Sequence, residues 1–66
     1  MKTVYDVQQL LKKFGTFIYI GDRIAELELM EMEVKELYES HLIGPEEYSK
    51  AILLLRKEAV QLQGNK

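Results

Sequence analysis

Apolar side chains recur at helical spacing in three separate stretches of this chain, and this periodicity constrains its fold more than any other feature. One side of the first predicted helix carries Val4, Val7, Leu10, Leu11 and Phe14. Such a stripe must be covered by other apolar surfaces, and the two later helical stretches offer them. Short connections between helices favour antiparallel neighbours. The sequence therefore predicts an all-α fold, a three-helix bundle formed by residues 1–66 as one domain.

Capping residues indicate where the first predicted helix begins and ends. Thr3 is a favourable N-cap, and Asp6 stands at the position that completes a capping box with it. Gly15 suits the left-handed position that follows a helix. We therefore expect this helix to run from about Val4 to about Phe14.

The other two helices have equally clear start signals. Asp22 is a favourable N-cap for a second helix from about Arg23 to about His41. Pro45 suits the first position of a third helix that should end near Gln63. We expect Leu53 and Val60 to widen the apolar stripe of this helix.

Residues 16–20 separate the first two predicted helices and are β-branched or aromatic, which favours an extended backbone. We expect them to form a connection laid across the bundle and anchored by Phe17 or Ile18. A chain of 66 residues without cysteine has no disulfide to stabilise it, so regular helix packing or a second copy must do so.

A second, shorter apolar stripe lies on the opposite face of the second predicted helix. It consists of Ala25, Leu29 and Met32. Two interpretations stand side by side. The stripe contacts another protein or a second copy of the chain, which would make a homo-oligomer, or residues 16–20 simply cover it.

The residues of this chain favour neither catalysis nor metal binding. His41 is the single histidine, and no carboxylate lies three residues before it, so no metal site is predicted. Ser40 and Ser49 lack a recognisable base and orienting group. The carboxylates of the second predicted helix should line a solvated face. We expect a protein that is not an enzyme and that uses no cofactor.

Apolar runs in the sequence are short. The longest, residues 17–20 and 51–55, fall far below the roughly 20 residues that cross a bilayer. The first residues also lack the apolar region of a signal peptide. We expect a cytoplasmic protein with no membrane partner.

Charge is distributed unevenly along the chain, whose net charge is −2. Residues 22–44 hold seven acids and two bases, a charge of −5, whereas residues 1–21 hold three bases and one acid, a charge of +2. Residues 45–66 hold four bases and three acids. The acidic middle would repel phosphate, so nucleic acid could approach only from elsewhere.

Basic and aromatic side chains do gather in the amino-terminal part. Tyr5 and Lys12 lie away from the apolar stripe of the first predicted helix, and Lys13, Tyr19 and Arg23 lie near the same end of the bundle. Aromatic rings stack on bases, and cationic side chains neutralise phosphates. The residues permit binding of single strands and fit an ordinary solubilising surface as well.

Residues 5–11, 14–19 and 21–23 together resemble the YqgQ-like family of small bacterial proteins. Residues 36–38 and 51–56 also match the family pattern, so the resemblance covers nearly the whole chain. It implies a three-helix bundle and a role in binding single-stranded DNA or RNA, and it brings no catalytic motif. The residues to which we assign that role are Tyr5, Lys12, Lys13, Tyr19 and Arg23.

Overall fold

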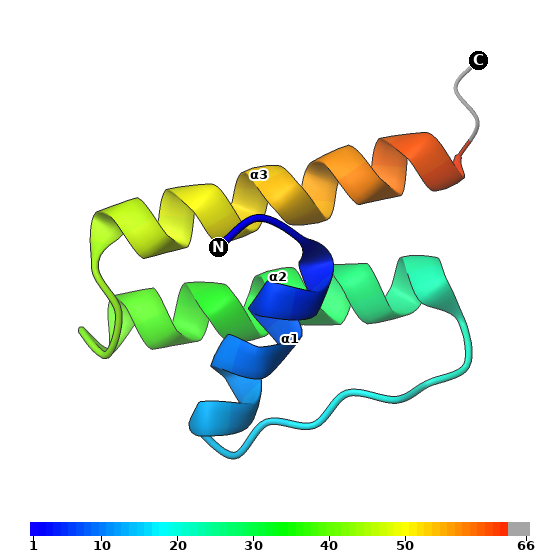
Figure 1. Cartoon of the computed structure of the whole chain (residues 1–66). Helices are drawn as coiled ribbons and strands as arrows, with labels where there is room; N and C mark the ends of the chain where they lie inside the picture. The colour runs from blue at the N-terminus through cyan, green and yellow to red at the C-terminus, as the bar shows by residue number, and fades with distance from the viewer. Residues whose placement is uncertain (64–66) are drawn as a thin grey trace.

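Two long helices lie side by side, and a shorter helix packs against one face of the pair (Figure 1). The computed structural model describes residues 1–63, so residues 64–66 of the predicted domain lie outside the described part. The helices are α1 (Val4–Lys13), α2 (Arg23–Glu39) and α3 (Pro45–Leu62). α2 and α3 run in opposite directions, and α1 crosses them steeply (Figure 1). The predicted all-α, three-helix fold is confirmed.

The predicted capping box begins α1. The Thr3 hydroxyl accepts the backbone N–H of Asp6 at 3.3 Å, and the Asp6 carboxylate accepts the N–H groups of Thr3 at 3.1 Å and Lys2 at 2.8 Å. The helix ends one residue before the predicted Phe14. Gly15 follows with φ of 84°, the left-handed conformation predicted for it.

Asp22 caps α2 as predicted, accepting the N–H of Ile24 at 3.1 Å. The helix stops two residues short of His41, however, and His41 adopts a left-handed φ of 64°. This conformation lets the N–H of Leu42 reach the carbonyl of Leu37 at 2.9 Å, which closes the end of the helix and turns the chain towards α3. A non-glycine residue in this region costs about 1 kcal/mol or more.

α3 begins at the predicted Pro45, and its Glu47 carboxylate accepts the N–H of Gly44 at 3.4 Å. The helix ends one residue before the predicted Gln63. Both acids of its first turn, Glu46 and Glu47, lie where the positive end of the helix dipole favours negative charge.

Buried side chains from all three helices and from the turn before α3 form one core. They are Val4, Val7, Leu10, Leu11, Leu27, Met30, Val34, Leu37, Ile43, Ala51 and Leu55.

Some apolar residues predicted for the core are exposed. Leu53 and Val60 were expected to widen the apolar stripe of the third helix, and this expectation is wrong. They lie on the side of α3 opposite Ala51 and Leu55, where no other helix reaches them. Phe14 also lies largely outside the core, at the end of α1.

Leu55 and Leu53 provide a matched test of this packing, because they lie two residues apart on one helix. Leu55 is fully buried, whereas Leu53 is 69% exposed. We expect Leu55→Ala to lower the free energy of unfolding by about 2–5 kcal/mol and Leu53→Ala to change it by less than about 0.5 kcal/mol. Urea unfolding followed by circular dichroism measures both. Equal losses would show that α3 buries a different face.

Candidate nucleic-acid interface

A linker, residues 16–21, connects α1 to α2. Its end is held by the carboxylate of Glu26, which accepts the backbone N–H groups of Ile20 at 3.0 Å and Gly21 at 3.1 Å. Arg23 lies 3.7 Å from the same carboxylate. Glu26 is only 8% exposed, so the expectation that the carboxylates of this helix all line a solvated face is wrong for this residue.

Hydrogen bonding explains the ionisation of Glu26. The N–H of Ile20, followed by that of Gly21, holds the pKa of the Glu26 carboxyl below its ordinary value, although partial burial acts in the opposite direction. The nearby Arg23 guanidinium lowers the pKa further. One signal in the sequence points to this contact. An extended segment leaves its N–H groups without helical partners, and an acid in the first turn of the next helix can accept them.

The middle of the linker alternates between core and solvent. Ile18 packs against the core, whereas Phe17 and Tyr19 on either side of it are exposed. This is the period of two residues expected of an extended chain. Of the two anchors considered from the sequence, Ile18 is therefore the one the fold uses. The start of the linker is fixed as well, because the N–H of Thr16 donates to the carbonyl of Leu11 at 3.0 Å.

A first hollow, of about 270 Å³, lies between α1 and the linker, and we call it the α1–linker hollow. Its floor is apolar and consists of Leu11, Ile18 and Met30. Its walls are formed by Gln8, Lys12, Thr16, Phe17 and Tyr19. Two of the residues predicted to bind nucleic acid, Lys12 and Tyr19, thus meet at one site.

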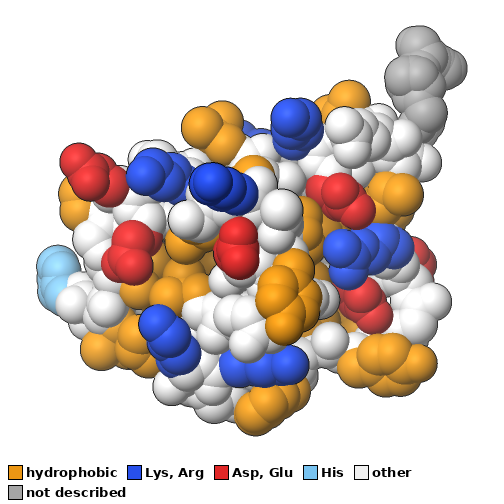
Figure 2. Space-filling view, in the orientation of Figure 1, with side chains coloured by type: hydrophobic (Ala, Val, Ile, Leu, Met, Phe, Trp, Pro, Cys, Tyr) orange, Lys and Arg blue, Asp and Glu red, His pale blue; other side chains and the backbone are white. Residues whose placement is uncertain are grey.

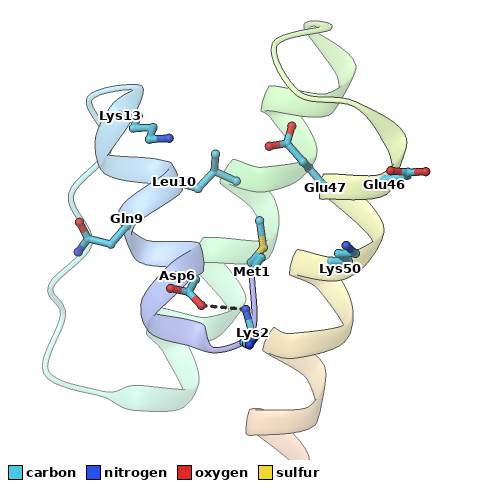
Figure 3. A pocket seen from close by; sticks show the side chains of 9 residues that line it. All are labelled: Met1, Lys2, Asp6, Gln9, Leu10, Lys13, Glu46, Glu47 and Lys50. Carbon is cyan, nitrogen blue, oxygen red and sulfur yellow. Dashed lines mark hydrogen bonds between the residues drawn. The ribbon is translucent and has the colours of Figure 1, made fainter.

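A second hollow, of about 440 Å³, lies on the other side of α1, between α1 and α3. Figure 3 shows Lys13 reaching from α1 across its opening, with Glu47 facing it from α3. The charged side chains around this α1–α3 hollow are Lys2, Asp6, Lys13, Glu46, Glu47 and Lys50. Carboxylates therefore offset much of its positive charge.

The five predicted residues are thus distributed rather than clustered. Tyr5 is 64% exposed on α1 and lines neither hollow, and Lys13 lines a different hollow from Lys12 and Tyr19. Arg23 is engaged by two carboxylates, at 3.7 Å by Glu26 and at 3.6 Å by Glu58 of α3. On the face of the molecule that carries α1, Figure 2 shows basic side chains separated by acidic ones.

Sequence reasoning missed one aromatic residue of the α1–linker hollow, Phe17. Phe17 was considered only as a core anchor, although its side chain is 74% exposed. The alternation of the linker was the available signal, because Ile18 inside places both neighbours outside. Gln8 lies one residue from Gln9, and the two amides line different hollows because neighbouring helical residues point about 100° apart.

The predicted interface stripe on α2 is divided as well. Ala25 and Leu29 are half-buried, whereas Met32 is 61% exposed. Met32 lines an open groove of about 560 Å³ between α2 and α3. The α3 residues along this α2–α3 groove are Tyr48, Ile52, Arg56 and Ala59. One ion pair lies at its edge, between Glu31 and Arg56 at 3.3 Å.

Within residues 1–63, no group of three or more histidine, aspartate or glutamate side chains is arranged to hold a metal ion. His41 is exposed at the turn after α2. None of the helices in the same part of the chain combines the length and the apolar character needed to cross a membrane.

Comparison with known proteins gives two matches. Residues 1–61 match the family model described as YqgQ-like. The chain is also 50% identical over 66 residues to "Uncharacterized protein YqgQ" of Bacillus subtilis (strain 168). That alignment covers 100% of this chain and 93% of the relative.

Glu26→Gln tests the carboxylate that holds the linker. Because the pKa of Glu26 is lowered in the folded state, its charge stabilises the fold above the unfolded-state pKa of about 4.3, and this contribution is lost as the pH falls through the lower, folded-state value. We therefore expect Glu26→Gln to be less stable than the wild type near neutral pH and to lose less stability between about pH 5 and pH 3.

Urea unfolding across this pH range measures the effect, and exposed Glu36 on the same helix supplies the control variant Glu36→Gln. Asp6, whose pKa is lowered by the N–H groups of Lys2 and Thr3, remains in both variants, so some acid sensitivity persists. Identical pH slopes for the wild type and Glu26→Gln would contradict the stabilising role of this contact.

Proposed function

We propose that this chain, which belongs to the YqgQ-like family, is a non-enzymatic protein that binds single-stranded DNA or RNA through the outer surface of α1 and the linker. One observation carries the proposal. The rings of Tyr5 and Tyr19 are largely exposed, and Tyr19 shares a hollow with Lys12. Single strands are commonly held by this combination of open aromatic faces and nearby cations.

The arrangement of the lysines suits a strand that crosses α1. Lys12 and Lys13 are adjacent in sequence, so their side chains point about 100° apart around the helix. Lys12 lines the hollow on one side of α1 and Lys13 the hollow on the other. A strand laid over α1 would therefore meet one cation on each side, and the ring of Tyr5 lies exposed on the same helix.

The other charges limit where a strand can lie. Arg23 is held by Glu26 and Glu58, so we assign it a structural role instead of the phosphate contact expected from the sequence. The many carboxylates of α2 oppose phosphate on that helix. With two lysines as phosphate contacts, binding should be modest and salt-dependent, with a log–log slope of about −1.4 for a single strand.

The double substitution Lys12→Glu and Lys13→Glu tests this function. We expect it to weaken binding of a labelled oligonucleotide by about tenfold or more at low salt, because two attractions become repulsions. Fluorescence anisotropy at two salt concentrations measures the loss. Lys35→Glu with Lys57→Glu, which changes the charge equally on α2 and α3, serves as the control. Wild-type binding that is absent at low salt, or indifferent to salt, would contradict the proposal.

A second candidate function is association through the α2–α3 groove, either with another protein or with a second copy. The observation in its favour is that Met32 is exposed beside Ile52 and Ala59, which gives the groove an apolar surface. Its charged edge carries Glu28 and Lys35 as well as the paired Glu31 and Arg56, so opposite charges are available to a second copy.

Met32→Glu tests self-association at this groove. If the chain associates there, sedimentation should show a wild-type oligomer that Met32→Glu converts to a monomer, because the burial of a charge opposes association. Leu53→Glu places the same charge on the outer side of α3 and should leave the oligomer intact. A monomeric wild type would exclude self-association at this groove.

A further inference from the structure

We infer that the α1–linker hollow holds one nucleobase of the bound strand, between the rings of Phe17 and Tyr19, with Lys12 on the adjoining phosphate. This inference rests on the function proposed above and deepens it, because it names the chemical group that enters the site. It also adds Phe17 and Gln8 to the residues expected to contact nucleic acid.

Two aromatic side chains of the linker are exposed to solvent. Phe17 is 74% and Tyr19 is 93% exposed, and both line the hollow. Exposed rings of this size forgo most of the stabilisation that their burial would bring. A third exposed ring, that of Tyr5, lies on α1 but outside the hollow. The two linker rings therefore form a local site of their own.

The spacing of Phe17 and Tyr19 along the linker suits a planar ligand. Residues two apart in an extended segment are separated by about 6.6 Å, because each residue advances about 3.3 Å. A flat ring stacked on another lies at a van der Waals separation of about 3.5 Å. Two stacked contacts therefore need about 7 Å, which is close to the spacing of about 6.6 Å from Phe17 to Tyr19, so the two rings can hold one planar base between them.

The remaining lining fits the edges of a base and its phosphate. Leu11 and Met30 provide an apolar, fully buried floor, and Gln8 offers an amide donor and an amide acceptor at the wall. Lys12 supplies the positive charge. The volume of about 270 Å³ lies below the range of about 300–1,000 Å³ typical of sites for larger organic ligands. A single base matches this size better.

The linker is held in a fixed position along its length. Its start is held by the N–H of Thr16 on the Leu11 carbonyl, its middle by Ile18 in the core, and its end by Glu26. Binding is favoured when the groups that contact a ligand are already in place. The α1–α3 hollow is a poorer site for a nucleotide, because the carboxylates of Asp6, Glu46 and Glu47 accompany its lysines.

The experiment compares two labelled oligonucleotides of equal length, one with bases and one fully abasic, by fluorescence anisotropy at low salt. We expect the wild type to bind the base-bearing strand more tightly. Phe17→Ala should weaken that binding by roughly 5- to 100-fold, as expected for loss of a stacked base, and should leave abasic binding nearly unchanged. Tyr5→Ala removes a ring outside the hollow and should reduce base-bearing binding less. Leu53→Ala is the control for an exposed apolar residue elsewhere.

The outcomes separate the two proposals. Binding of the abasic strand as tightly as the base-bearing strand overturns the base site and leaves the nucleic-acid function standing. Failure of both strands to bind at low salt overturns both. An equal loss for both strands in Phe17→Ala also overturns the base site, and circular dichroism of that variant checks that it is folded.

Because the sequence contains no tryptophan, the fluorescence of one introduced tryptophan gives a direct readout of binding. In Phe17→Trp the single indole reports on the hollow, and its fluorescence should be quenched by the base-bearing strand but not by the abasic one. Titration with a free mononucleotide distinguishes a base carried by a strand from a soluble nucleotide. Quenching by the mononucleotide at a lower concentration than by the strand would overturn the assignment to a strand, and no quenching by either would overturn the base site.

Discussion

The carboxylate of Glu26 holds the end of the linker against α2, a contact that helix packing alone does not provide. α2 and α3 form an antiparallel pair, and α1 must be brought back across one face of that pair, where the three helices share one core. The linker makes this connection, and its last N–H groups have no helical partner to bond with. Glu26 accepts those of Ile20 and Gly21 from the first turn of α2, with Arg23 and Glu58 extending the network to α3.

Local chemistry made much of the fold predictable from the sequence. The capping box of Thr3 and Asp6, the N-cap Asp22 and the proline that opens α3 each act over a few residues, so they can be recognised without a structure. The helix ends differed from expectation by one or two residues. His41 was the largest departure, because its left-handed conformation depends on how Leu42 and the chain after it must turn.

The site was less predictable, since it depends on contacts between residues distant in sequence. Periodicity identified exposed residues on α1. It could not show that Lys12 and Lys13 face separate hollows, or that Arg23 forms an ion pair with Glu58. It also overestimated the core, because Leu53 on α3 has no helix opposite it. In each case the identity of the residue was informative, and the neighbour supplied by the tertiary fold decided its role.

The apolar floor of the α1–linker hollow links occupancy to the integrity of the whole molecule. Leu11 of α1 and Met30 of α2 meet there, so the hollow exists only while α1 is docked on the helical pair. Any molecule seated in it binds the docked form and not the undocked one. Mass action then makes the ligand a stabiliser of that form, by an amount set by its concentration relative to its dissociation constant. Docking of the first helix and filling of the hollow are, in this fold, one coupled equilibrium.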